Sequence, residues 1–312
     1  MIMRVLVTGG AGYIGSVLVP ALIGRGWDVT VLDTFASGEP LLAACCAATN
    51  FHPVRGDTRD PAVVAPLVKN ADLVIPLAAL VGAPLCARDT IGATTLNRDA
   101  IVAIAKMTSP NQRIIYPTSN SGYGVGEANA FCTEESPLRP ISLYGRTKVE
   151  AEDAVLASGH GVTLRLATVF GMSPRMRLDL LVNDFTWRAV TDRAVVLFEA
   201  HFRRNYIHVR DVVKAFLHAA DNFESMRNEP YNVGLSAANL SKAQLCERIA
   251  RQVPGFTYLE APIGEDPDKR DYIVSNAKLE ATGWQPDVTI DAGIQELIKG
   301  FQMMRNSRYA NV

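Results

Sequence analysis

Several features are missing from this sequence, and each absence excludes a class of protein. Neither sign of charge is in excess, because 31 Lys and Arg residues face 32 Asp and Glu residues and the formal net charge is -1. A general attraction to nucleic acid or to an anionic membrane is therefore not expected. The 5 cysteines are odd in number and form no C-x-x-C pair, and the 5 histidines show no metal-ligand spacing. We predict no disulfide framework, no metal site and a reducing, cytoplasmic compartment.

Long apolar runs are also missing. The most apolar stretch, residues 73–86 (LVIPLAALVGAPLC), is too short to span a bilayer, and Pro76, Gly82 and Pro84 interrupt it. A strand pattern begins almost at the first residue, which leaves no room for a signal peptide. With 48% hydrophobic residues among 312, the composition is that of a globular protein with a large core. We expect a soluble protein with no membrane partner.

The first half of the chain alternates short β-branched runs with longer helical patterns. The runs are apolar on both faces, which indicates a parallel sheet covered by helices on both sides, the doubly wound α/β architecture. We predict strands at 4–9, 28–33, 51–57, 72–79, 112–119 and 162–171. We predict helices near 13–25, 40–48, 61–69, 92–107 and 144–158.

From about residue 172 this alternation stops. Segments rich in arginine and aromatic residues follow, and helical patterns return near 209–222, 241–252 and 289–304. We therefore predict that residues 1–171 form the doubly wound domain and that residues 172–312 form a smaller, mixed α/β region for substrate. Residues 205–222 are apolar enough to pack back on the first domain.

The stretch VLVTGGAGYIGS (5–16) joins the first predicted strand to the first predicted helix through a glycine-rich turn. Gly9, Gly12 and Gly15 allow positive φ, close approach of a phosphate and close helix–strand packing. Free N–H groups and the helix dipole favour an anion at this point. Asp33 ends the next predicted strand, where a carboxylate accepts hydrogen bonds from an adenosine ribose and repels a 2′-phosphate. The pattern predicts a Rossmann-type site for NAD rather than NADP; the alternative is a tight turn in a purely structural βαβ unit.

A second motif, Tyr144-x-x-x-Lys148, lies within SLYGRTKVEAE (142–152). One helical turn separates the two side chains, so the Lys148 ammonium stabilises a Tyr144 phenolate and lowers the pKa of this tyrosine from ~10 toward neutral. Such a tyrosine is a general base for a sugar hydroxyl. Ser119 ends the predicted strand at 112–119, at the sheet edge where ligands bind, and its hydroxyl is placed to contact the same substrate oxygen. Taken alone, a Tyr-x-x-x-Lys pair is more often a solvated helix face.

Together these motifs resemble those of an extended short-chain dehydrogenase/reductase, and more narrowly of the NAD-dependent nucleotide-sugar epimerase/dehydratase family. In the second half of the chain, RRNYIHVRDVV (203–213) also resembles that family. The resemblance implies a Rossmann-type, NAD-dependent enzyme that acts on a nucleotide-diphosphate sugar. It also implies a homodimer formed by the helices near 92–107 and 144–158, which carry more apolar residues than one buried face requires.

The resemblance implies roles for individual residues. Those for the cofactor are Gly9, Gly12, Tyr13, Ile14, Gly15, Asp33, Asp57, Thr58, Leu77, Ala78, Ala79, Asn97, Tyr144 and Lys148. Those for the substrate are Ser119, Asn120, Ser121, Thr168, Arg177, Asn183, Arg204 and Arg270. An arginine fork suits a diphosphate. The alternative for Arg204 is a solvated pair with Arg203, and the alternative for Arg270 is a surface ion pair with Asp268 or Asp271.

The two residues after Ser119 restrict the choice among the reactions of this family. The 4,6-dehydratases of the family carry Asp-Glu at the next two positions and the decarboxylases carry Glu at the second, whereas this chain has Asn120 and Ser121. Oxidation at sugar C4 remains, and the 4-keto product is either released by a 4-dehydrogenase or reduced on its other face by a 4-epimerase. The segments 118–124 and 170–185 resemble GDP-heptose 4-dehydrogenases of capsular polysaccharide biosynthesis, which favours that reaction and a GDP-sugar. A 4-epimerase and a non-catalytic dinucleotide-binding regulator are the alternatives.

Overall fold

The computed structural model describes residues 2–127, 130–261 and 270–304. The chain folds as two compact units. The first unit comprises residues 1–122, 140–165 and 213–231, and the second comprises 123–139, 166–212 and 232–312. The first unit therefore takes in a segment that follows residue 171 in the sequence.

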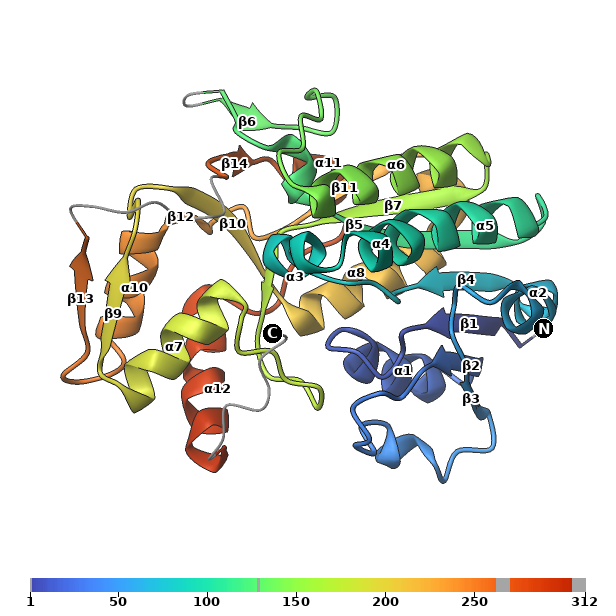
Figure 1. The fold of residues 1–312 in the computed structure, drawn as a ribbon, viewed down its shortest axis with the longest axis horizontal. Helices are drawn as coiled ribbons and strands as arrows, with labels where there is room; N and C mark the ends of the chain where they lie inside the picture. Colours follow the sequence, from blue (N-terminus) through green and yellow to red (C-terminus); the bar gives the residue numbers. More distant parts are fainter. Residues whose placement is uncertain (1, 128–129, 262–269, 305–312) are drawn as a thin grey trace. The chain divides into compact units, whose positions relative to one another are not determined.

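A seven-stranded sheet has the order β11-β7-β5-β4-β1-β2-β3, and several of its strands follow one another in Figure 1. The pairings of β1 with β2, β2 with β3, β1 with β4 and β4 with β5 are parallel. The strand order reverses between β1 and β4, and open α/β sheets bind ligands beyond the carboxyl ends of the strands at such a point. The strands are β1 (Arg4–Thr8), β2 (Asp28–Asp33), β3 (Phe51–Arg55), β4 (Leu73–Pro76), β5 (Arg113–Ser119), β7 (Gly161–Leu166) and β11 (Pro230–Val233). This arrangement confirms the predicted Rossmann-like α/β class.

Most of the helices that follow these strands lie where the sequence pattern predicts them. They are α1 (Gly15–Gly24), α2 (Pro61–Asn70), α3 (Ala83–Arg88), α4 (Thr90–Thr94), α5 (Ala100–Met107), α6 (Leu143–Ala157), α8 (Val209–Asp221) and α9 (Phe223–Met226). The helices α2, α5 and α6 pack in a row, α2 against α5 and α5 against α6. The Asp60 carboxylate begins α2 by accepting the Ala62 N–H at 2.9 Å, and the Ser142 hydroxyl begins α6 by accepting the Gly145 N–H at 3.1 Å.

Among its described residues, the second unit holds three small sheets, with orders β12-β10-β8, β13-β9 and β14-β6. Its strands are β6 (Phe131–Cys132), β8 (Thr168–Phe170), β9 (Ala194–Leu197), β10 (Arg203–His208), β12 (Asn239–Ser241), β13 (Thr257–Glu260) and β14 (Ile273–Val274). Its helices are α7 (Leu181–Thr191), α10 (Lys242–Ala250), α11 (Ala277–Glu280) and α12 (Ile290–Met303). It is a mixed α/β region, as the composition after residue 172 predicts.

Three predicted elements are wrong. The helix predicted at 40–48 is a single 3₁₀ turn, Ala43–Cys45. Its alanines favour a helix, but only Leu42 and Cys45 are buried there, so no apolar face holds a longer helix in place. The strand predicted at 162–171 is broken at Ala167, because β7 belongs to the large sheet whereas β8 pairs with β10 in a small one.

The helix predicted at 92–107 is a chain of shorter pieces. A new helix, α3, precedes it, and α4 begins where the Asp89 carboxylate accepts the Gly92 N–H at 2.7 Å. Between α4 and α5 lies a π-helical turn, Thr95–Asp99. Such turns are rare and occur frequently at functional sites.

One core cluster between the sheet and its helices tests the fold directly. Leu6 of β1 is 1% exposed and packs with Leu32, Val68 and Ile104. Leu6→Ala is expected to lower the free energy of unfolding by about 2–5 kcal/mol, since the deleted methyl groups leave a cavity. Denaturant unfolding measures this loss. Ile2→Ala, at a side chain that is 67% exposed, is the control and is expected to change the midpoint little; equal losses for both variants would contradict the placement of Leu6.

Candidate active site

The glycine turn is shaped by close backbone contacts. Gly9 has φ +70°, and a Cβ at this position would lie 2.6 Å from the Ala78 nitrogen. A Cβ at Gly15 would lie 2.5 Å from the Gly10 carbonyl oxygen, so α1 approaches the turn as closely as glycine allows. At Gly12, by contrast, a Cβ would meet only the Gly9 carbonyl oxygen, at 3.1 Å. The turn therefore leaves its open face at Gly12, which fits the approach of a phosphate group.

Asp33 ends β2 beside this turn. Its Oδ2 accepts the Ala11 N–H at 2.9 Å and its Oδ1 accepts the Phe35 N–H at 2.8 Å. These two bonds fix the carboxylate, and each oxygen keeps acceptor capacity for a further donor. A half-buried carboxylate held in this way fits the hydroxyl groups of a ribose and disfavours a 2′-phosphate.

The loop after β4 is tied to the π-helical turn. Leu77, Ala78 and Ala79 are half-buried, and the Leu77 N–H donates to the Thr8 carbonyl at 2.8 Å. Asn97 is fully buried, and its side-chain amide bonds both the N–H and the carbonyl of Leu80, each at 2.8 Å. The structure therefore places Asn97 as a clamp on the loop that carries Leu77 to Ala79.

Cys86 of α3 belongs to the same contact. Its thiol is fully buried and donates to the Leu80 carbonyl at 3.3 Å, while the Asn97 amide donates to the sulfur at 3.7 Å. Burial raises the pKa of the thiol, so it stays protonated. Cys86 is therefore a buried packing residue beside the loop that Asn97 holds.

The helix α6 carries Tyr144 and Lys148 one turn apart, as predicted. Gly145 lets the start of this helix pack against the turn that follows β5, because a Cβ there would lie 3.1 Å from the Ser121 carbonyl oxygen. Tyr144 is half-buried and Lys148 is 5% exposed. The phenol and the ammonium of the motif thus stand in very different environments.

Lys148 is held against an aromatic ring that the sequence analysis missed. Its Nζ lies 4.1 Å from the centre of the Tyr116 ring, and Tyr116 is fully buried on β5. Burial lowers the pKa of Lys148 to about 7, and the negative charge of Glu152 opposes this shift. The ring face also favours the charged form. Tyr116 stands three residues before Ser119 in an apolar strand, and no sequence signal separates it from an ordinary core tyrosine.

Ser119, Asn120 and Ser121 form a polar corner at the end of β5. The hydroxyls of Ser119 and Ser121 are 2.8 Å apart, and the Ser121 N–H donates to the Ser119 hydroxyl at 3.1 Å. Asn120 is 1% exposed, and neither its amide nitrogen nor its amide oxygen has a hydrogen-bond partner among the described residues. A buried amide without partners is costly, so this side chain is suited to a ligand that carries both a donor and an acceptor.

The remaining predicted cofactor residues also lie in the first unit. Tyr13 is buried and Ile14 is half-buried just before α1. Thr58 is 7% exposed. Asp57 is bound by the Arg59 guanidinium, with Nη2 and Oδ2 2.6 Å apart, and this hydrogen bond holds the pKa of the Asp57 carboxyl below its usual value.

The predicted substrate residues outside this corner all belong to the second unit. Thr168 on β8 and Arg204 on β10 lie on paired strands. Arg204 is 3% exposed, so a solvated pair with Arg203 is excluded, and its guanidinium lies 5.7 Å from the centre of the Tyr272 ring. Asp271, one alternative partner for Arg270, instead accepts the Arg203 N–H at 2.8 Å. The other, Asp268, lies outside the described residues.

Asn183 and Arg177 hold a loop of the second unit. Asn183 is fully buried on α7; its amide donates to the Arg177 carbonyl at 2.9 Å and accepts the Gly171 N–H at 3.0 Å. The Arg177 guanidinium is directed at Asp179, with Nε and Oδ1 3.0 Å apart. These contacts give both side chains a structural part in the loop.

Within the described part of the chain, no three His, Cys, Asp or Glu side chains are arranged to hold a metal. No helix there has the length and apolar character needed to cross a membrane.

Comparison with known proteins agrees with this site. The family model described as the NAD dependent epimerase/dehydratase family matches residues 5–234. A low-salt glycan biosynthesis protein of Haloferax volcanii is 29% identical over 95% of this chain and 97% of its own length. A putative UDP-glucose 4-epimerase of Methanocaldococcus jannaschii is 26% identical over 97% of this chain and 99% of its own length. A UDP-glucuronic acid decarboxylase of Arabidopsis thaliana is 26% identical over 96% of this chain and 70% of its own.

Solved structures of named epimerases are also similar to this chain. The UDP-glucose 4-epimerase of Thermotoga maritima, determined with UDP-glucose, superposes with a TM-score of 0.83 at 26% identity, covering 96% of this chain and 99% of its own. The UDP-glucose 4-epimerase of Thermus thermophilus, determined with NAD, gives 0.81 at 26% identity with the same coverage. The chain belongs to the NAD dependent epimerase/dehydratase family, and it is an NAD-dependent enzyme of the short-chain dehydrogenase/reductase type. The alternative of a non-catalytic regulator is therefore set aside.

The different surroundings of Gly12 and Gly15 predict different defects. Gly12→Ala is expected to lower the unfolding midpoint less than Gly15→Ala does and to weaken NAD binding about tenfold or more, because the new methyl group occupies the least crowded face of the turn. Gly15→Ala is expected to lower both stability and affinity, since its Cβ collides with the Gly10 backbone. Calorimetric titration with NAD and thermal unfolding separate the two effects. Unchanged affinity in Gly12→Ala would place the phosphates elsewhere.

Proposed function

We propose that the enzyme oxidises C4 of a nucleotide-diphosphate sugar. The observation that carries this proposal is that Tyr144 and the buried Lys148 share one face of α6, in the same unit as the glycine turn. Tyr144 takes the proton of the C4 hydroxyl as general base, and Lys148 stabilises its phenolate. The Ser119 hydroxyl bonds the same oxygen. When bound, NAD supplies the acceptor for the hydride that leaves C4.

Further residues are proposed to position the sugar nucleotide. The buried Asn120 amide offers a donor and an acceptor, which matches a sugar hydroxyl, and Ser121 lines the same corner. In the second unit, Arg204 and Arg270 are proposed to bind the diphosphate and Thr168 the sugar. Arg177 and Asn183 are proposed to shape the loop over the nucleotide through their contacts with each other.

The fate of the 4-keto sugar separates two reactions. A GDP-heptose 4-dehydrogenase of polysaccharide biosynthesis, with a GDP-sugar as substrate, stays the finer prediction from the sequence. A 4-epimerase is the second candidate, because curated and structural relatives at 26% identity carry that name and act, by their names, on UDP-glucose. Dehydration and decarboxylation are disfavoured, since Asn120 and Ser121 offer no carboxylate for either step. A cytoplasmic location also stays a prediction.

The reaction test combines Tyr144→Phe with product analysis. We expect the variant to lower turnover by about 10² or more while NAD still binds, because only the proton acceptor is removed. The purified enzyme is incubated with GDP- and UDP-sugars, with and without a 2-oxo acid as acceptor, and products are identified by mass spectrometry. A 4-keto sugar that accumulates only with the acceptor indicates the dehydrogenase. A product of unchanged mass without the acceptor indicates the epimerase. Wild-type turnover in Tyr144→Phe would remove the basis of the proposal.

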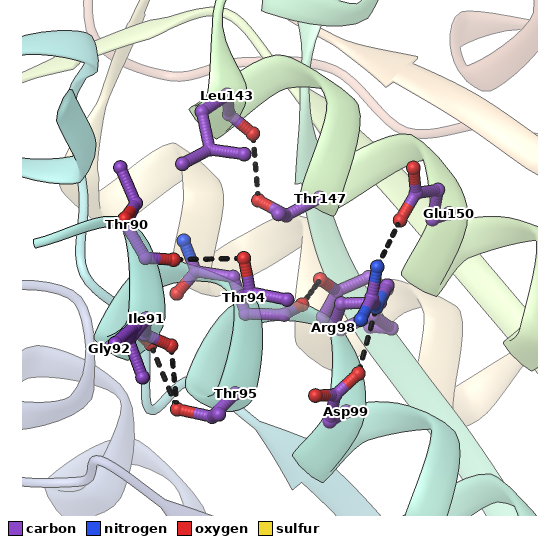
Figure 2. Close-up of polar contacts among 12 residues, drawn as sticks. Thr90, Ile91, Gly92, Thr94, Thr95, Arg98, Asp99, Leu143, Thr147 and Glu150 are labelled. Atoms are coloured by element: carbon purple, nitrogen blue, oxygen red, sulfur yellow. Dashed lines mark hydrogen bonds and ion pairs between the residues drawn. The ribbon is translucent and has the colours of Figure 1, made fainter.

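The homodimer is proposed to form through the surface that α4, the π-helical turn and α6 share. Figure 2 shows the hydroxyls of Thr94, Thr95 and Thr147 turned back to carbonyls of their own helices, at 2.8, 2.9 and 3.0 Å. Thr94 and Thr95 are half-buried, whereas Thr147 is 2% exposed. Ile91 is 77% exposed among them, at an open hollow of about 440 Å³ that Leu143 also lines.

Charged side chains border this apolar patch. Arg98 contacts Asp99 at 2.7 Å and Glu150 at 3.1 Å (Figure 2). An apolar centre with a charged rim is the composition of a self-complementary interface, in which each copy covers the patch of the other. Coverage by a second copy also accounts for the exposed isoleucine.

Ile91→Asp is expected to shift the protein from dimer to monomer, because the interface would bury two unpaired carboxylates. Sedimentation velocity over a range of concentrations measures the change. Leu259→Asp is the matched control, since Leu259 is 64% exposed on β13 of the other unit. A wild-type protein that sediments as a monomer, or an Ile91→Asp variant that stays dimeric, contradicts the proposed surface.

A further inference from the structure

The face of α6 that carries Tyr144 and Lys148 continues one turn further, to Glu152. This carboxylate is 1% exposed, and Arg165 of β7 holds it: Nη2 and Nε donate to Oε1 at 2.6 and 2.9 Å. Buried ion pairs contribute little net stability, because the loss of hydration offsets the attraction. The position of this pair beside Lys148 points to a different role.

Among the described residues, few ionisable side chains face the Lys148 ammonium. The ionisable side chains that face it come from α6, β5 and α3 and are Tyr144, Glu152, Tyr116 and Cys86. Burial keeps the thiol and the Tyr116 phenol protonated, so neither supplies a negative charge at neutral pH. The charged residues Arg98 and Asp99 of the π-helical turn pair with each other on its exposed side. Among the residues that the structure describes, Glu152 is the buried carboxylate one helical turn from Lys148, and its charge opposes the effect of burial on the pKa of this lysine.

We propose that Glu152 is a positioning residue for the reaction: its buried carboxylate keeps the Lys148 ammonium charged, and Arg165 holds that carboxylate in place. The inference rests on the proposed role of Tyr144 and Lys148 in the oxidation. Burial drives Lys148 toward its neutral form, which would no longer stabilise the Tyr144 phenolate. A carboxylate one turn away acts through a poorly solvated interior, where its effect on the lysine is large.

Two substitutions separate charge from packing. Glu152→Gln keeps the size of the side chain and an oxygen for Arg165 but removes the charge. Glu152→Asp keeps the charge but loses a methylene group. If Glu152 acts by its charge, the glutamine variant is the defective one. If it acts only by packing, the aspartate variant is at least as defective.

The direct measurement is a pH titration of Lys148 in the NAD-free protein, by NMR of side-chain-labelled lysine, with Lys148→Met to assign the signal. The wild-type midpoint is expected at about pH 7. Glu152→Gln is expected to lower it by about one unit or more, and Glu152→Asp to leave it near the wild-type value. Asp153→Asn is the control on the same helix, since Asp153 is exposed, and it is expected to leave the midpoint unchanged.

A second readout uses the reaction. The alkaline limb of the kcat/KM profile is expected to move to lower pH in Glu152→Gln by the same amount as the titration. Should Glu152→Gln not fold, Glu152→Leu combined with Arg165→Met removes both charges together and is expected to lower the midpoint in the same direction. A midpoint that does not move in the charge-removing variant, or that moves more in Glu152→Asp, overturns the inference. The titration needs no substrate, so it tests the role of Glu152 even if no sugar nucleotide is oxidised. Failure to oxidise any sugar nucleotide would count against the proposed function alone.

Discussion

A lysine ammonium that is almost completely removed from water is the constraint on which this active site depends. Lys148 is 5% exposed, and burial alone would favour its neutral form. The Tyr116 ring at 4.1 Å and the carboxylate of Glu152 act against that tendency. The pKa of about 7 reflects this balance. The protonation of such a lysine depends strongly on its neighbours, so the packing of α6 on β5 bears on the role proposed for Lys148 as well as on the fold.

The cofactor side of the site depends on a second set of close contacts, between backbones. Gly9 approaches Ala78 so closely that a side chain has no room, and Asn97 clamps the same loop through Leu80. Asn97 lies within the π-helical turn, a kind of turn that occurs frequently at functional sites. The contacts of Gly9 and Asn97 therefore fix the loop after β4 against both the glycine turn and the π-helical turn within the first unit.

The sequence predicts the elements whose signals are local. Strands β1, β2 and β5 and helices α1, α2 and α6 follow from apolar periodicity and from the glycine turn, and the family follows from motifs that combine them. The sequence analysis found no local signal for the π-helical turn, and the bond between the Leu80 N–H and the Asn97 side chain joins residues 17 positions apart. Glu152 looks like one more acid on a charged helix until Arg165 of β7 is seen to hold it in the interior. In the sequence, Tyr116 likewise looks like an ordinary core tyrosine, and only the structure shows Lys148 over its ring.

The same reasoning explains why the family is clear whereas the reaction depends on a few side chains. The roles proposed for the glycine turn, Asp33, Tyr144 and Lys148 suit any oxidation of a sugar hydroxyl by NAD, so they are compatible with relatives named epimerase and decarboxylase alike. The outcome depends on which side chains contact the keto sugar. At the site proposed for it, this chain has Asn120 and the two serine hydroxyls, which donate and accept hydrogen bonds but are neither acids nor bases near neutral pH. A site of this chemistry can hold a 4-keto sugar without promoting its further breakdown, which is a property that both release and reduction of that sugar require.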